Sequence, residues 1–180
     1  MMEIWVALVG ALWLLIPAYA ANGWPPLARG RMTIDRGRTT ADGRRIFGDS
    51  KTIEGFVVGV AAGTFYGIIE SYLYPGFNLY AGMFGVSMPL MTPFVGFMIA
   101  FGALVGDLGG AFIKRRLGMP PGSDAPGLDQ LNFIVGAIIF SFAFTSITIP
   151  MAIIMLLLTP LIHRFVCIIG HALKFKKVPW

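Results

Sequence analysis

The sequence predicts an all-α integral membrane protein with about five transmembrane helices and cytoplasmic polar loops. Hydrophobic residues make up 56% of the 180 residues and charged residues only 13%, against roughly 25% charged in soluble domains. All 14 Lys and Arg residues fall in three short stretches between or after apolar segments. Because a spanning helix needs about 20 apolar residues, residues 1–180 are expected to form a single membrane domain.

The first span is expected at about residues 4–21. Ala18-Tyr19-Ala20 is typical of a signal-peptidase site, but the only early charge is Glu3. A signal peptide carries basic residues before its apolar run, so we interpret the segment as a retained helix. The next apolar stretch predicts a second span at about 53–74.

The remaining spans follow from length and from the prolines. Pro89 and Pro93 interrupt the next apolar region, which leaves one span at about 93–113. The apolar residues 131–170 would reach about 60 Å as one helix, twice the hydrocarbon thickness. We therefore expect a hairpin, with spans at about 131–147 and 150–170.

The basic residues predict the orientation in the cell membrane. If the N-terminus is outside, loops 22–52 and 114–130 and the C-terminal tail are all cytoplasmic, and no Lys or Arg is left outside, as the positive-inside rule requires. This rule and the anionic lipid headgroups also account for the net charge of +5. We therefore expect no nucleic-acid partner.

Two of the spans carry glycine at every fourth position, which places each set on one helix face. Missing side chains let helix backbones approach closely. We therefore expect these two spans to pack with their cytoplasmic ends, and so Lys51 and Asp107, close together. The glycines are Gly55, Gly59, Gly63 and Gly67 in the second span and Gly102, Gly106 and Gly110 in the third.

Asp107 and Asp129 are the candidate metal ligands. Each lies at a cytoplasmic helix end with no His or Cys cluster beside it, which favours Mg²⁺, with Mn²⁺ as the alternative, over zinc or copper. Carboxylates at membrane depth are usually functional, and we expect Asp107 to be unpaired. The structural alternative is an ion pair from Asp107 to Lys114 or Arg115.

Residues 48–52 open the second span with groups that suit phosphate, because N-cap side chains and unpaired N–H groups at a helix start bind anions. They are not a P-loop, since Gly48 and Lys51 are not adjacent and no strand precedes them. The candidate phosphate ligands are Arg44, Arg45, Asp49, Ser50, Lys51, Thr52, Arg115 and Arg116.

The chain resembles the archaeal CDP-archaeol synthases, which are related to the bacterial CDP-diacylglycerol synthases. The resemblance covers nearly the whole chain. This sequence departs from the broader cytidylyltransferase signature at Ala111, where that signature has Ser, and it lacks the His-Gly-Gly before the final acid. The matching blocks are residues 17–22, 33–35, 42–52, 106–107, 112–116 and 126–130.

The resemblance implies the reaction of CTP with 2,3-bis-O-geranylgeranyl-glycerol 1-phosphate, an isoprenoid ether-lipid phosphate, to give a CDP-lipid and pyrophosphate. It implies that Asp107, Asp129 and Lys114 are catalytic and that both carboxylates hold Mg²⁺ on the triphosphate.

Two alternative functions are a small multispan transporter and a lipid-binding protein without catalysis. A transporter needs polar residues along its pore, and Glu70 is the only acid clearly within a span. A lipid-phosphate phosphatase would need a His after Ser-Gly, and neither His has that context.

Overall fold

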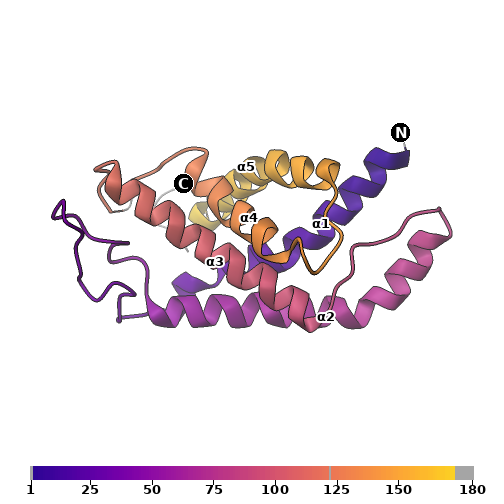
Figure 1. Cartoon of the computed structure of the whole chain (residues 1–180), viewed down its shortest axis with the longest axis horizontal. Coiled ribbons are helices and arrows are strands. Elements are labelled where there is room, and N and C mark those ends of the chain that lie inside the picture. Colours follow the sequence, from indigo (N-terminus) through magenta and orange to yellow (C-terminus); the bar gives the residue numbers. More distant parts are fainter. Residues whose placement is uncertain (1, 122, 173–180) are drawn as a thin grey trace.

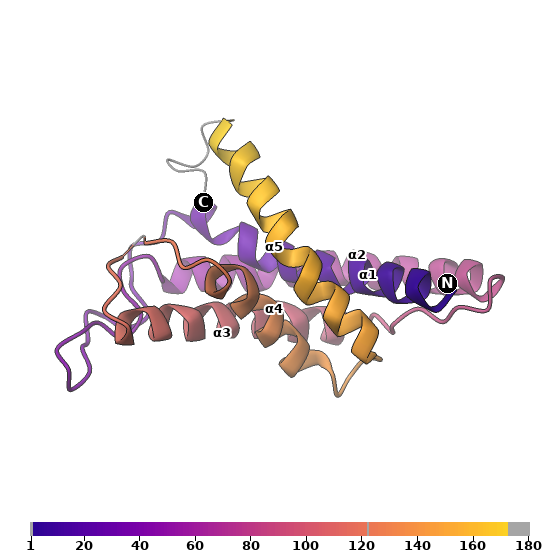
Figure 2. The same ribbon diagram turned by 90° about the horizontal axis from the view of Figure 1, so that it is seen from above.

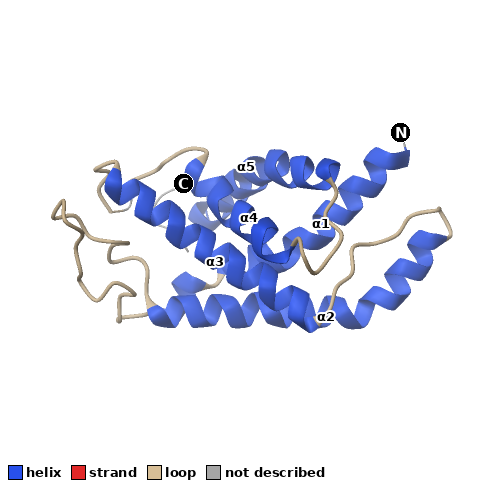
Figure 3. Cartoon of the chain, in the orientation of Figure 1, coloured by secondary structure: helices blue, strands red, loops and turns tan. Residues whose placement is uncertain are grey.

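The protein is described here by a computed structural model that covers residues 2–121 and 123–172. Within these ranges there is no β-strand, only two isolated bridges in the first loop, so the predicted all-α fold is confirmed (Figure 3). The elements are α1 Met2–Gly23, the 3₁₀ helix η1 Pro25–Ala28, α2 Ile53–Gly82, α3 Pro93–Arg116, α4 Leu128–Ser141 and α5 Ile149–Ala172.

Of the described helices, α1, α2 and α3 are long and apolar enough to cross a membrane. α2 continues eight residues beyond the expected end at residue 74, although Pro75 lies inside it, and Figure 1 shows it bending in its second half. A proline cannot donate the helical hydrogen bond, and this is a common cause of such bends.

α4 is shorter than the expected span, because it has 14 residues and ends at Ser141. At 1.5 Å per residue it is about 21 Å long, less than the hydrocarbon thickness of about 30 Å. The following turn is held against the α2–α3 connection, since the Thr145 hydroxyl donates to the Leu90 carbonyl at 2.7 Å.

The polar loops gather at one end of the molecule. Figure 1 shows residues 29–52, 117–121 and 123–127 together at this end, whereas the start of α1 and the connection 83–92 lie at the other. Figure 2 shows α5 crossing the remaining helices at a steep angle. The predicted placement of both polar loops on one side therefore agrees with the helix arrangement.

The glycines of α2 bring three helices into backbone contact. A Cβ atom at Gly67 would lie 2.5 Å from the Cα of Gly96 in α3, and one at Gly63 would lie 2.6 Å from both the Cβ of Ala100 and the carbonyl oxygen of Pro17 in α1. Leu14 and Ile99 are almost fully buried in the core that these helices share.

The glycines Gly102, Gly106 and Gly110 of α3 face α4 instead of α2. A Cβ atom at Gly102 would lie 2.5 Å from the carbonyl oxygen of Gly136, and Gly106 and Gly110 both meet Asn132. α3 therefore packs closely on two sides, with α2 on one face and α4 on the other, which holds the loop ends of three helices together.

Candidate active site

A cavity of about 600 Å³ opens among the loop ends of the helices. It is lined from the first loop and α2, from α3, from the loop 117–127 and α4, and from single residues of α1 and α5. Of the candidate site residues, it brings together Ser50, Lys51, Thr52, Asp107, Lys114, Arg115 and Asp129.

Lys51 and Asp107 form the first ion pair in this cavity. The Lys51 Nζ atom lies 2.5 Å from the Asp107 Oδ2 atom, and both side chains are about a quarter exposed. The close approach of Lys51 and Asp107 predicted from the glycine spacing is confirmed. The expectation that Asp107 is unpaired is wrong, and so is the alternative pairing with Lys114 or Arg115, because Lys51 reaches it across the interface of α2 and α3.

Lys114 and Asp129 form the second ion pair. The Lys114 ammonium donates to both Asp129 carboxylate oxygens, at 2.9 and 2.8 Å, and to the carbonyl of Ser123 at 2.6 Å. Asp129 also accepts from the backbone N–H of Ala125. The pair thus connects the end of α3 to the start of α4 across the intervening loop.

Arg115, Ser50 and Thr52 complete the predicted set inside the cavity. The Arg115 guanidinium donates to the carbonyl of Pro120 at 3.0 Å. Thr52 is the N-cap of α2, and its hydroxyl accepts from the backbone N–H of Gly55 at 3.2 Å. The start of α2, with its positive dipole end, therefore faces the same space as the cations.

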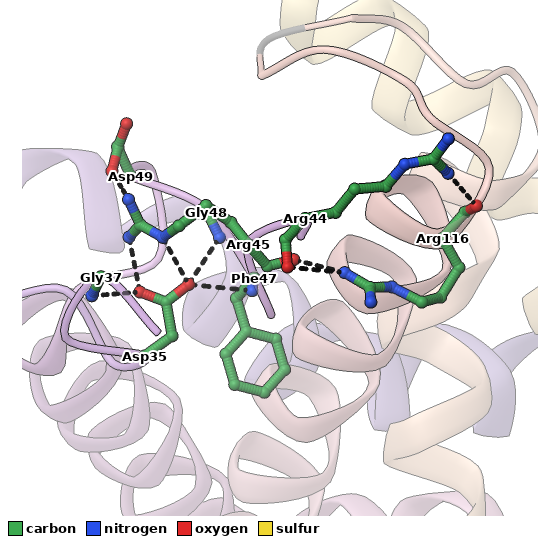
Figure 4. A network of polar contacts seen from close by, with 8 residues as sticks. All are labelled: Asp35, Gly37, Arg44, Arg45, Phe47, Gly48, Asp49 and Arg116. Atoms are coloured by element: carbon green, nitrogen blue, oxygen red, sulfur yellow. Dashed lines mark hydrogen bonds and ion pairs between the residues drawn. The ribbon is translucent and has the colours of Figure 1, made fainter. Parts of the chain in front are cut away.

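Arg44 and Arg116 do not line the cavity but hold the first loop on the end of α3 (Figure 4). Arg44 donates to the carbonyl of Arg116 at 2.6 Å, and Arg116 donates to the carbonyl of Arg45 at 2.6 Å and to Asp42 at 2.8 Å. These bonds satisfy the carbonyl at the end of α3, which lacks a helical partner. The phosphate role of both arginines stays a prediction.

Asp35 organises the interior of the first loop, with Arg45 and Asp49 beside it (Figure 4). Arg45 bridges Asp35 and Asp49, and neither of its partners lines the cavity. Burial alone would raise the pKa of Asp35, but its hydrogen bonds outweigh burial and hold the pKa well below its usual range. The donors are Arg45 and the backbone N–H groups of Gly48, Phe47 and Gly37.

The two candidate metal ligands have the right chemistry for Mg²⁺ but form an incomplete set. Asp107 and Asp129 offer hard oxygen donors to the same cavity. Among the described residues no group of three or more His, Cys, Asp or Glu side chains could hold a metal ion. The residues therefore fit a metal whose remaining ligands come from substrate phosphates and water.

Sequence reasoning missed four polar residues of the cavity: Asn22, Ser123, Asp124 and His163. The Tyr19 hydroxyl donates to the carbonyl of Thr159 at 3.3 Å, one turn before Asn22 and His163 in their helices. This contact joins residues 140 positions apart in α1 and α5, and no local sequence pattern predicts it. Asp124 could have been suspected, since it lies in the charged stretch that ends at Asp129.

A second concave surface of about 560 Å³ lies between α3 and α4. Its lining is almost entirely apolar and includes Gly106, Gly109 and Gly110 of α3 together with Leu131 and Val135 of α4. It begins at Gly127 and Leu128, directly before Asp129. The apolar surface therefore starts next to the charged cavity.

Comparisons with known proteins all match enzymes of archaeal membrane lipid synthesis. A family model described as "CarS-like: CDP-archaeol synthase" covers residues 2–180. A CDP-archaeol synthase of Pyrococcus furiosus is 43% identical over 170 residues, which is 94% of this chain and 96% of the relative. One from Methanospirillum hungatei is also 43% identical, over 92% of this chain and 100% of the relative. A solved structure of "an intramembrane enzyme for archaeal membrane lipids biosynthesis" has 37% sequence identity and a TM-score of 0.76, and it covers 88% of this chain and 93% of that chain.

Proposed function

Because the chain belongs to the CarS-like family of CDP-archaeol synthases, we propose that its charged cavity transfers the cytidylyl group of CTP to an archaeal ether-lipid phosphate. The chain is a membrane-embedded nucleotidyltransferase of archaeal lipid synthesis. The proposed acceptor is 2,3-bis-O-geranylgeranyl-glycerol 1-phosphate, and the products are the CDP-lipid and pyrophosphate.

One observation carries this assignment of the site. Two Lys–Asp pairs, drawn from the first loop, α3 and α4, face one cavity where the polar loops meet the apolar helices. Lysine ammonium groups neutralise phosphates, and carboxylates hold a hard divalent cation. A site for two phosphate-bearing substrates, one of which is a lipid, needs lysines and carboxylates together at the edge of the membrane.

The chemistry joins two anions. An oxygen of the lipid phosphate attacks the α-phosphorus of CTP, the new P–O bond forms, and the bond from the α-phosphorus to the bridging oxygen breaks, with pyrophosphate as leaving group. Lys51, Lys114 and Arg115 would neutralise the repulsion and the charge that develops on the leaving group. No general base is required, because a phosphate monoester is already ionised at neutral pH.

Asp107 and Asp129 would hold Mg²⁺, or Mn²⁺ in its place. When bound, the cation supplies charge neutralisation and orientation of the triphosphate oxygens. The starting turn of α2, with Ser50 and Thr52, would receive another phosphate oxygen at its N–H groups.

The apolar surface between α3 and α4 suits an isoprenoid chain. It starts beside Asp129 and continues along the glycines of α3, so a lipid lying there would place its phosphate at the charged cavity. With the N-terminus outside, this cavity faces the cytoplasm, where CTP is available. The transporter alternative is not favoured, because the family and the relatives are synthases.

The test is transfer of label to lipid. Purified full-length protein is incubated with Mg²⁺, the ether-lipid phosphate and CTP labelled on the α-phosphorus, and then in parallel with dCTP, ATP and GTP. We expect labelled lipid from CTP and dCTP, with much less from the purine nucleotides. Equal rates with all four would refute the cytidylyltransferase assignment, and label on CMP or CDP instead of lipid would refute the attack at the α-phosphorus.

A further inference from the structure

We infer that Lys51 and Lys114 are exchangeable counterions, which occupy Asp107 and Asp129 until a triphosphate arrives, so that the cavity binds a divalent cation with the nucleotide and only weakly without it. This inference rests on the proposed function of the cavity. It assigns both lysines a second role, as competitors of the metal in the substrate-free protein.

The carboxylates of Asp107 and Asp129 are already paired with lysine ammonium groups. Lys51 lies 2.5 Å from an oxygen of Asp107. Lys114 donates to both oxygens of Asp129, and one of these oxygens also accepts from the Ala125 N–H. A cation could coordinate Asp129 only after the Lys114 ammonium moves away.

The charges that line the cavity explain why a metal alone gains little. Three cations, Lys51, Lys114 and Arg115, face three carboxylates, Asp107, Asp124 and Asp129, so the described lining is formally neutral, with His163 counted as neutral. A lone Mg²⁺ would meet two ammonium groups beside its ligands, and each ammonium would have to give up the carboxylate with which it is paired. The repulsion between the metal ion and these ammonium groups is only partly screened in a half-buried site.

A triphosphate removes this obstacle by offering each ammonium new oxygen partners. Lys51 and Lys114 then move from carboxylate to phosphate, and the freed carboxylates bind the metal that the same phosphates already coordinate. Arg115 takes no part in this exchange, because its guanidinium donates to the carbonyl of Pro120 and to no carboxylate among the described residues. Metal and nucleotide should therefore bind with strong positive coupling.

The experiment measures Mn²⁺ binding to the full-length protein in detergent, from the electron paramagnetic resonance signal of free Mn²⁺. We expect weak binding to the wild type without nucleotide, and binding about tenfold tighter in Lys51→Met and in Lys114→Met. The matched control is Arg115→Met, which removes the same charge from the same cavity without releasing a carboxylate, and its affinity should change by less than about threefold. Because CTP alone also removes free Mn²⁺, binding with nucleotide is measured as the Mn²⁺ that stays with the protein on gel filtration at fixed free Mn²⁺, and CTP should tighten it at least about tenfold in the wild type and by less in the lysine variants.

Two outcomes overturn the inference. If the lysine variants bind Mn²⁺ no more tightly than Arg115→Met, the lysines do not compete with the metal. If the double variant Lys51→Met/Asp107→Asn binds Mn²⁺ as tightly as Lys51→Met alone, the metal does not use Asp107. Lys114 also donates to the Ser123 carbonyl, and its loss removes this structural contact. If Lys114→Met fails to fold, the comparison of Mn²⁺ affinities is made with Lys51→Met alone. A wild type that transfers no label from CTP to lipid refutes the proposed function instead, and the Mn²⁺ titration does not depend on that assay.

Discussion

Replacing Asp107 by Asn separates a metal ligand from a residue that only forms an ion pair. The substitution keeps the size of the side chain but removes the charge that a hard cation requires. If Asp107 holds Mg²⁺ on the triphosphate, turnover should fall at least about a hundredfold, equivalent to about 2.7 kcal/mol of barrier.

The structure also predicts the change in stability. The Lys51–Asp107 pair has a 2.5 Å contact, and its side chains are 24% and 23% exposed. A pair this accessible is worth about 1 kcal/mol, so we expect Tm to fall by about 2–4 °C for a chain of this size. Without the pair, the substitution would have left Tm unchanged or raised it.

The assay compares Asp107→Asn with Lys51→Met, which removes the same pair from the other side. Initial rates are measured across a Mg²⁺ titration, and Tm is measured in the same detergent. Asp107→Asn should need far more Mg²⁺ for half-maximal rate, whereas Lys51→Met should not. If both variants lose the same activity with an unchanged Mg²⁺ dependence, or if Asp107→Asn is destabilised but active, Asp107 serves only the ion pair.

Three further predictions test the loop, the helix packing and the orientation. The pKa of Asp35 lies well below its usual range, so its contribution to stability is fully present above about pH 5 and is lost as the pH falls from about 4 towards the folded-state pKa. Asp35→Asn should therefore lower Tm at pH 7 by more than at pH 2, and an equal loss at both would contradict this. Gly67→Ala places a Cβ 2.5 Å from the Gly96 backbone and should cost about 2 kcal/mol, whereas Gly76→Ala in the same helix meets nothing within 4 Å and serves as the control in thermal unfolding. Cysteines placed at Glu3 and at Lys177, the latter outside the described residues, should react with an impermeant reagent in intact cells only at position 3, and labelling at 177 would exclude the proposed orientation.

The sequence was sufficient for properties that depend on local pattern. Apolar run lengths predicted five helices. The glycine spacing of the second and third spans predicted that Lys51 and Asp107 approach each other, which is confirmed, although Gly102, Gly106 and Gly110 pack against α4 and not against α2. The end of α4 was not predictable, because residues 142–147 are as apolar as a span, and the helix stops where the turn contacts the carbonyl of Leu90.

Partner choice among the charged residues depends on the tertiary structure. In sequence Arg44, Arg115 and Arg116 are equivalent cations, yet only Arg115 lines the cavity. Arg116 pairs with Asp42, 74 positions away, and no spacing rule connects them. Asn22 and His163 were missed for the same reason, since the contact between α1 and α5 that places them exists only in the folded protein.

The contribution of α1 and α5 to one cavity has a consequence for biosynthesis. When α4 has left the ribosome, the chain already holds both lysines and both carboxylates of the ion pairs, but the side of the cavity that His163 lines does not yet exist. The last helix to be synthesised must return to the first before this wall is closed. The side of the cavity that His163 lines therefore forms only after α5 has been synthesised and has packed against α1.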